Sequence, residues 1–424
     1  MSETRPRSAA MQRNFLAQIL HGTFGQAGQR LITAPTFMPA FLLGVLGSEF
    51  LVGLCRSLQA LSAALSPTLA AHLLGQRQRI KGLAIGMAFL ARMPLLLLAL
   101  LAAFGSGPLL GLWIAGALVL FGLCQGAQQV ALNLLRARTI RPGRRGAALG
   151  ARNFFGGLAA MALALWLGSR GNDNSYSLFF TLAFGLTALG VASLLLTQEA
   201  PVAPQASTLR SHRLKDTLGE VWRLTQTPSP FRTFLGSYSF TCTARMALPF
   251  YILFLTTSGN AAAAPDAELI GLLSAIWIGA AVLSRLPLGL LADAIGGVRV
   301  YRLGIGAWLV GNGVFLAMSL GMPKSLMAVV IGLAILGLGS AATELTAQNL
   351  VLELGANDAA PQRLSATTTV AQFLVALSQL LGGALLQYAG FLALAGTAGL
   401  LLFLALLRAG HLLTPSRGPY PQEP

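Results

Sequence analysis

Three arginines, Arg30, Arg92 and Arg245, lie within stretches that are otherwise apolar enough to cross a lipid bilayer. A guanidinium group keeps its charge at physiological pH and presents five N–H donors, so it needs an acceptor wherever water is scarce. A charged side chain deep in a bilayer costs from about 2.5 to well over 10 kcal/mol, and it therefore normally faces a polar cavity or a partner. We expect Arg30 and Arg245 to bind an acidic group, whereas Arg92 has a purely structural alternative.

Two further residues of these stretches could carry a proton. Glu344 lies well inside an apolar stretch, where the charge state of a carboxyl group depends on its neighbours. The imidazole of His21 titrates near neutral pH. If a proton takes part in the chemistry, Glu344 is the first candidate to carry it and His21 the second. The alternatives are a permanent ion pair between Glu344 and an arginine, and a hydrogen-bonded packing role for His21.

The elements that must position these residues are membrane helices. Only 10% of the residues are charged, against about 25% in ordinary globular proteins, and 55% are hydrophobic. Apolar runs of about 20 residues, long enough to cross the hydrocarbon core as a helix, recur along the chain. We therefore predict an all-α membrane protein with twelve transmembrane helices. The predicted spans are residues 15–40, 49–74, 82–104, 108–134, 147–168, 176–197, 233–257, 269–292, 302–321, 326–350, 365–388 and 390–408.

The net charge of +16 is distributed unevenly. If both termini lie in the cytoplasm, 21 of the 29 Lys and Arg residues fall on the cytoplasmic side, two on the opposite side and six within spans. This is the positive-inside bias of membrane proteins, so the charge indicates topology and not nucleic-acid binding. The polar, basic N-terminus has no short apolar core with a cleavage site, and we expect no removable signal peptide. We predict a multi-pass protein of the cytoplasmic membrane with both termini in the cytoplasm.

Residues 198–232 interrupt the hydrophobic pattern. The segment begins with a Pro/Ala-rich stretch, and apolar residues from Leu214 to Trp222 follow at helical spacing. This pattern predicts a short amphipathic helix on the cytoplasmic membrane surface. The predicted domains are an N-terminal six-helix bundle (1–197), a cytoplasmic linker (198–232) and a C-terminal six-helix bundle (233–424).

The two halves carry a sequence repeat. Val52-Gly53-Leu54-Cys55 recurs 218 positions later as Ile270-Gly271-Leu272-Leu273, and each run leads to a basic turn. Parallel six-helix repeats with a binding site between them at mid-membrane are a known plan of membrane transporters. The repeat therefore predicts a site between the two halves.

Gly289, Asp293 and Gly296 have the spacing of a turn between two helices of one half in the major facilitator superfamily. The chain resembles this family over nearly its whole length. The stretches GMAFLARMPLLLL and RPGRRGAALGARNFFGG look like a bacterial branch whose substrates are mostly unassigned. The resemblance implies two six-helix bundles that rock about a central site, in the inner membrane of a bacterium. The chain departs from the family at the equivalent turn of the first half, where the acid is missing near Ala71 and Gly75.

The resemblance also implies that helices 1, 4, 7 and 10 line the central cavity, and these four spans have the densest intramembrane polarity. In helix 1, Gln18, His21 and Gln29 fall on one face, and a polar face this wide cannot contact lipid. Hydrogen bonding between helices is the alternative role for each polar residue. The candidate substrate-binding residues are His21, Gln29, Arg30, Gln125, Gln129, Tyr238, Arg245, Glu344 and Gln348.

A gate on the cytoplasmic side is a further implication of the resemblance. Asp293 would dock on the cytoplasmic start of predicted helix 5, near Gly146 and Ala147, because a helix N-terminus carries about half a positive charge. This contact would close the cytoplasmic side. The candidate gating residues are Gly289, Asp293, Gly296, Arg299, Arg144, Arg145 and Arg152.

No pattern in the sequence indicates enzyme chemistry. The chain has no GxxxxGK[ST] loop for ATP and no cluster of His and acids at metal-ligand spacing. Its three cysteines all fall inside predicted spans. We therefore predict no enzyme activity, no metal site and no cofactor.

We interpret the chain as a secondary transporter that moves a small organic solute by alternating access. The arginines and amides favour a solute with anionic or strongly hydrogen-bonding groups. Two alternatives stay open, namely export of a drug or amphiphile, and a transport-inactive protein that acts as a sensor or assembly factor. The expected partners are the small-molecule substrate, membrane lipid and, for coupled transport, protons; we expect a monomer and no nucleic acid.

Cysteine labelling tests the predicted topology. With a membrane-impermeant maleimide, Asn260→Cys should react in intact cells and Ser207→Cys only after permeabilisation, because the predicted linker is cytoplasmic. Reaction of both cysteines in intact cells would contradict the topology.

Overall fold

The structure, a computed structural model, describes residues 4–75, 79–139, 142–170, 175–199, 229–257, 267–354 and 360–412. Every regular element in these ranges is a helix, and none of their residues forms a strand. An α-helix satisfies its backbone hydrogen bonds within one segment, as a chain surrounded by lipid requires. The amphipathic helix predicted for the linker lies outside the described residues.

The helices follow the predicted spans closely. The first half contains α1 (Thr4–Thr33), α2 (Phe37–Leu46), α3 (Glu49–Gly75), α4 (Lys81–Leu90), α5 (Met93–Phe104), α6 (Leu110–Thr139), α7 (Pro142–Gly168), α8 (Ser175–Ser193) and the 3-10 turn η1 (Leu194–Leu196). The second half contains α10 (Pro230–Ala244), the 3-10 turn η2 (Arg245–Ala247), α11 (Phe250–Thr257), α12 (Ala267–Leu283), α13 (Arg285–Ile295), α14 (Gly297–Ser319), α15 (Leu326–Glu353) and α16 (Ala360–Gly410).

Several predicted spans consist of two helical pieces, and α16 contains two spans. Gly390 interrupts α16 with a φ of 79°, a backbone conformation that favours glycine, and α16 consists of two helices that meet across this kink. Within the described residues, eight helices are long and apolar enough to cross a membrane, and the bent pair α1–α2 would make a ninth. The architecture is that of an all-α membrane protein, and the number of twelve crossings stays a prediction.

The first helix of each half is broken. α1 and α2 meet at an angle of 43° across residues 34–36. Pro35 lies in this break, and proline cannot donate the backbone hydrogen bond that a continuous helix needs. In the second half, α10 ends in the 3-10 turn η2, and Pro249 precedes α11. Both breaks leave backbone groups free to contact other helices.

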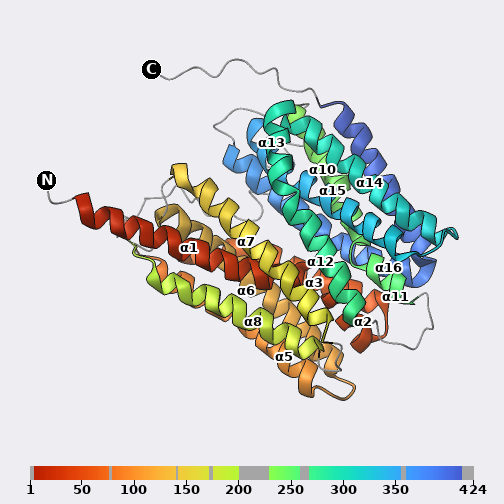
Figure 1. The fold of residues 1–424 in the computed structure, drawn as a ribbon, viewed down its shortest axis with the longest axis horizontal. Helices are drawn as coiled ribbons and strands as arrows, with labels where there is room; N and C mark the ends of the chain where they lie inside the picture. Colours follow the sequence, from red (N-terminus) through yellow and green to blue (C-terminus); the bar gives the residue numbers. More distant parts are fainter. Residues whose placement is uncertain are drawn as a thin grey trace.

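The helices form two bundles, with α1 to α8 in one and α10 to α16 in the other (Figure 1). The largest contacts between the bundles are those of α3 with α16 and of α7 with α12. The position of the boundary at 198–232 stays a prediction, because residues 200–228 are not described.

Two glycine pairs bring the bundles together at these contacts. A Cβ atom on Gly53 would lie 2.9 Å from the Cα of Gly383, and one on Gly271 would lie 2.5 Å from the Cα of Gly168. Such close approach of two helix backbones requires small residues on both helices. Gly53 and Gly271 are equivalent positions of the sequence repeat, so the internal symmetry of the chain generates both contacts.

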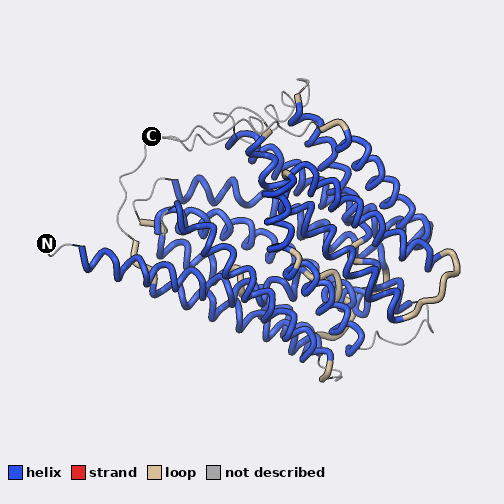
Figure 2. The backbone as a smooth tube through the Cα atoms, turned by 45° about the horizontal axis from the view of Figure 1, so that its top comes forward, coloured by secondary structure: helices blue, strands red, loops and turns tan. Residues whose placement is uncertain are grey.

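The glycine contacts lie at the end of the molecule opposite the start of α1 and the end of α16. At the same end, Ser274 of α12 hydrogen-bonds Thr36, and the Gln387 side-chain oxygen accepts from the Glu49 backbone N–H at 3.1 Å. Figures 1 and 2 show the bundles side by side at α2, α3 and α11 and far apart toward the start of α1 and the end of α16. If the termini are cytoplasmic, this arrangement is closed outside and open inside.

Adding a methyl group at one glycine contact tests this closure. Gly271→Ala should push α12 away from α7 and favour opening of the closed end, because the new Cβ would overlap the Gly168 backbone. Spin labels at Ser106 and Met322, which are exposed near this end, should give longer distances in the variant. Gly306→Ala is the matched control, since nothing lies within 4 Å of a Cβ at Gly306. Equal distance distributions in the two variants would argue against the contact.

Candidate functional site

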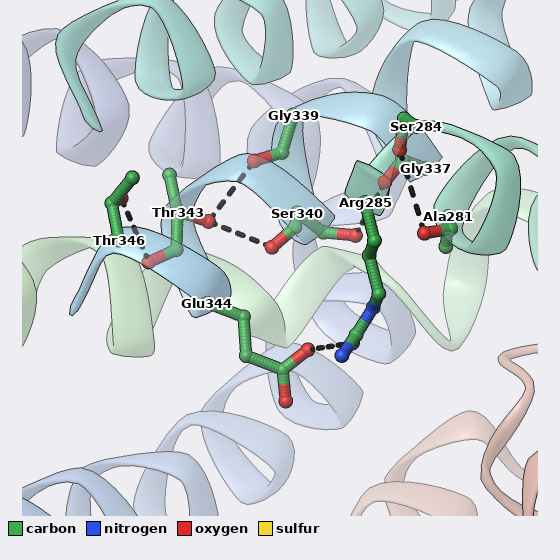
Figure 3. A network of polar contacts seen from close by, with 9 residues as sticks. All are labelled: Ala281, Ser284, Arg285, Gly337, Gly339, Ser340, Thr343, Glu344 and Thr346. Atoms are coloured by element: carbon green, nitrogen blue, oxygen red, sulfur yellow. Dashed lines mark hydrogen bonds and ion pairs between the residues drawn. The ribbon is translucent and has the colours of Figure 1, made fainter. Parts of the chain in front are cut away.

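An ion pair joins Arg285 and Glu344 (Figure 3). A terminal guanidinium nitrogen of Arg285, at the start of α13, donates to a carboxylate oxygen of Glu344 on α15 at 2.7 Å. The two side chains are 28% and 45% exposed, so a ligand can reach both. The structure thus contains an ion pair between Glu344 and an arginine, which is the alternative to a proton-carrying role that the sequence suggests for Glu344.

The hydroxyl groups around the ion pair present acceptors to their neighbours. Ser340 and Thr343 donate to the carbonyl oxygens of Gly337 and Gly339, each at 3.0 Å (Figure 3). A hydroxyl that donates its single proton to its own helix has only lone pairs left for other groups. These two hydroxyl groups of α15 thus offer acceptors, and donors for an anion come from other groups, the arginines among them.

Arg30 and Arg245 approach Glu344 from the two broken helices. Arg30 lies in the last turn of α1, and Arg245 begins η2. The charges of Arg285 and Glu344 act on Arg30, and the charge of Glu344 acts also on Arg245. The two breaks place one guanidinium from each bundle within electrostatic range of the same carboxylate.

A pocket of about 260 Å³ adjoins Glu344. It joins four of the residues predicted to bind substrate, from helices α10, α15 and the turn η2: Tyr238, Arg245, Glu344 and Gln348. Its other polar walls come from Cys242 and from the start of α16, with Thr367, Thr368 and Gln372. The volume is slightly below the usual range of about 300–1,000 Å³ for ligand sites and suits a small solute.

Positive charge exceeds negative charge around this centre. Arg152 on α7 is within electrostatic range of Arg30, which adds a fourth arginine to Arg30, Arg245 and Arg285. The Nε atoms of all four are buried and have no hydrogen-bond partner among the described residues. Against these four charges stands the carboxylate of Glu344. A cation that is removed from water without a partner is destabilising, so the arrangement favours binding of an anion.

The pocket is lined by residues of the second half alone, so Arg30 and the other residues predicted in the first half do not line it. His21 is buried between α1 and α8, and its Nδ1 atom is 2.9 Å from the Gly190 carbonyl oxygen. Gln29 and Gln125 are half-buried and Gln129 is exposed, and none of the three lines the pocket. Their role in binding stays a prediction.

Arg92 has a structural environment. Its guanidinium donates to the side-chain oxygen of Gln128 and, at 2.5 Å, to the carbonyl oxygen of Ala88. The side chain is 5% exposed. These bonds join α6 to the junction of α4 and α5. Arg92 thus has contacts of the kind that the structural alternative expects.

The predicted gating residues of the second half lie at the open end. Asp293 and Arg299 are exposed, and Gly296 has a φ of 96°, which favours glycine. A Cβ atom at Gly289 would have no other atom within 4 Å. Steric crowding therefore does not require a glycine at this position in the present arrangement. The proposed acceptor for Asp293 lies where side chains are not described, which includes Arg144, Arg145, Gly146 and Ala147. Docking of Asp293 therefore stays a prediction.

Sequence reasoning misses two features of the site. The position of Arg285 in its span points to the cytoplasmic end, yet its side chain reaches Glu344. The contribution of α16 to the pocket could have been predicted from the spacing of Thr368, Gln372 and Gln379. This spacing puts three polar residues on one face of a helix. The breaks have a signal too, since an arginine precedes a proline by five residues at Pro35 and by four at Pro249.

Comparison with known proteins gives information on the fold. The sequence matches no protein-family model and no curated protein sequence. The structure resembles that of a mutant of the nucleoside transporter NupG, with a TM-score of 0.73, 12% identity and coverage of 94% of this chain and 98% of that chain. It also resembles a D-xylose-proton symporter, with a TM-score of 0.70, 12% identity and coverage of 95% and 97%.

A bacterial homologue of the iron transporter ferroportin in its inward-facing state gives a TM-score of 0.65, with 13% identity and coverage of 95% and 98%. The chain has the major facilitator fold. The same homologue in its outward-facing state gives a TM-score of 0.59, with 14% identity and coverage of 94% and 98%. In the described part of the chain, no group of three or more His, Cys, Asp or Glu could hold a metal ion.

The gate can be tested at Asp293. Asp293→Asn should favour the state that is open at the terminal end about two- to fivefold, because an anion at a helix N-terminus contributes about 0.3–1 kcal/mol. Distances between spin labels at Arg79 and His411, both exposed at that end, report the change. Glu268→Gln removes an acid near the opposite end of the same helical region and serves as the control. An Asp293→Asn distribution that equals the wild-type one would count against the gate.

Proposed function

We propose that this chain is a secondary transporter of small organic anions that works by alternating access between its two bundles. The proposal includes the domain division at residues 198–232, a cytoplasmic-membrane location with both termini inside, and a monomer. Its central observation is the ion pair of Arg285 with Glu344 beside a pocket that Arg245 also lines, with Arg30 of the other bundle within electrostatic range of the pair.

The charge balance of the site supports an anionic substrate. Glu344 is bonded to Arg285, and the buried Nε donors of Arg30 and Arg245 have no hydrogen-bond partner among the described residues. Guanidinium binds carboxylate or phosphate through two parallel hydrogen bonds, and such charge-assisted bonds are roughly twice as strong as neutral ones. A substrate with an acidic group would satisfy both arginines and would contact the two bundles at once.

Glu344 provides a route by which binding of a proton is coupled to binding of the substrate. When the site is empty, its carboxylate offsets part of the arginine charge. An acidic substrate would bring a second negative charge close to the Glu344 carboxylate, so protonation of Glu344 would remove the repulsion between them. The site can thereby link binding of an organic anion to binding of a proton. His21 is a less suitable carrier, because it is packed against Gly190.

The second candidate function is export of a drug or amphiphile. The exposed aromatic and aliphatic residues of the helices would be compatible with it, but a site that concentrates arginine charge suits neutral or cationic amphiphiles poorly. A transport-inactive sensor would bind its ligand without moving it. Uptake into vesicles separates these functions.

Lysine replacement tests the arginines. In proteoliposomes supplied with labelled organic acids, Arg30→Lys and Arg245→Lys should each lower the uptake rate at least about tenfold, because lysine keeps the charge but cannot form the two-pronged bond. Arg170→Lys, at an exposed arginine beyond α7, is the matched control and should transport like the wild type. Wild-type uptake by both cavity variants would refute the assigned role. Failure of the wild type to move any acid while it still binds one would favour the sensor.

A further inference from the structure

The pocket beside Glu344 has more polar groups than one acidic group of a ligand would use. Arg245 provides the positive charge of the described lining, and a single carboxylate bound to it would leave the neutral groups without a ligand partner. These neutral groups are amides and hydroxyls of α15 and α16: Gln348, Thr367, Thr368 and Gln372. Their chemistry therefore bears on the rest of the solute.

The carboxylate of Glu344 has an oxygen to offer to a ligand. Its Oε2 atom accepts from Arg285 at 2.7 Å, and the other oxygen, Oε1, points away from that arginine (Figure 3). The side chain is 45% exposed and lines the pocket, so Oε1 can accept a hydrogen bond from a ligand. Because Arg285 already balances the charge of Glu344, a neutral donor such as a hydroxyl group suits this oxygen better than an ammonium group.

Two amide side chains add groups of the same kind. Gln348 and Gln372 both line the pocket, and both are exposed. An amide carries donors and an acceptor at one end, and a hydroxyl group both donates and accepts. An amide can therefore bond neighbouring hydroxyl groups of one ligand, whereas a carboxylate would use only its donors.

Thr367 is a polar residue of the lining that is almost fully buried. The residue is 5% exposed, and its Oγ1 atom has no hydrogen-bond partner among the described residues. A buried hydroxyl group without a partner is destabilising. A ligand that brings hydroxyl groups into the pocket would offer it one.

We propose that the start of α16 and Glu344 form a hydroxyl-binding subsite, so that the transported solute is a hydroxylated organic acid. Its acidic group would bind Arg245, and hydroxyl groups on the adjacent carbons would bind Glu344, Thr368 and Gln372. The inference rests on the proposed transport of organic anions and narrows its substrate class. Helix α16 is outside the four helices that the family resemblance assigns to the cavity, so selection among acids would come from an element that the resemblance does not predict.

Four acids with the same four-carbon chain test this subsite. Butyrate, 3-hydroxybutyrate and threonate carry no, one and three hydroxyl groups, and 3-aminobutyrate has an ammonium group in place of the hydroxyl. In calorimetric titrations of the purified protein, threonate should bind at least about tenfold more tightly than butyrate, because a site that bonds hydroxyl groups disfavours an analogue without them. The affinity for 3-hydroxybutyrate should lie between the two, and 3-aminobutyrate should bind less tightly than 3-hydroxybutyrate.

Substitutions on α16 assign this preference to the subsite. Thr368→Val with Gln372→Met removes the polar groups at nearly constant size, so threonate should lose about tenfold in affinity. Butyrate has no hydroxyl group and should bind this variant within about twofold of the wild type, which also shows that the variant is folded. Thr369→Val is the matched control, because Thr369 is the next residue of α16 and does not line the pocket. It should keep the preference for threonate.

The outcomes separate this inference from the proposed transport. Equal affinities for butyrate and threonate would overturn the subsite and leave transport of organic anions standing. Tighter binding of 3-aminobutyrate than of 3-hydroxybutyrate, an unchanged preference in the α16 double variant, or binding of none of the four acids would also overturn it. Tight binding of threonate without its uptake into vesicles would instead count against transport while the subsite stands.

Discussion

A guanidinium group in a membrane interior requires negative charge or water around it. The described residues of this site provide negative charge through the carboxylate of Glu344. The described centre holds four arginines against the carboxylate of Glu344. Desolvation disfavours such an excess of charge, and only a cavity open to water or an anion from outside relieves it. The two helix breaks place Arg30 and Arg245 at the ends of helical segments, and Arg245 lines the cavity beside Glu344.

The two broken helices connect this charge to the opening of the molecule. Arg30 and Arg245 lie directly before the breaks, and α2 and α11, which follow them, pack together at the closed end. The glycine contacts of Gly53 with Gly383 and of Gly271 with Gly168 hold the bundles at the same end. An anion bound to both arginines would therefore contact the segments that must separate when the closed end opens. Occupancy of the site and movement of the bundles are coupled through the same backbone.

The sequence predicts helix positions better than it predicts side-chain directions. Long apolar runs locate helices, and the joint appearance of Tyr238, Arg245, Glu344 and Gln348 at one pocket follows from neighbouring helices with facing polar stripes. His21 belongs to the polar stripe of α1, but that stripe is shared with α8, because Gly28 and Gly190 allow the two helices to approach and His21 turns toward Gly190. The reach of Arg285 to Glu344 depends on the packing of α13 against α15, and no periodicity in the sequence specifies it.

If the arginine charge selects an anion, the most direct measurement compares matched ligands that differ in charge alone. Thermal unfolding of the purified protein can be followed with succinate and with succinamide, its uncharged diamide, and with other acid–amide pairs of similar size. A ligand that binds the folded state raises the unfolding temperature by mass action. At 100 times its dissociation constant, it increases the free energy of unfolding by about 2.7 kcal/mol. We expect that at least one acid stabilises the wild-type protein, that its amide does not, and that Arg30→Gln abolishes the difference. Equal stabilisation by acid and amide would contradict selection of an anion by these arginines.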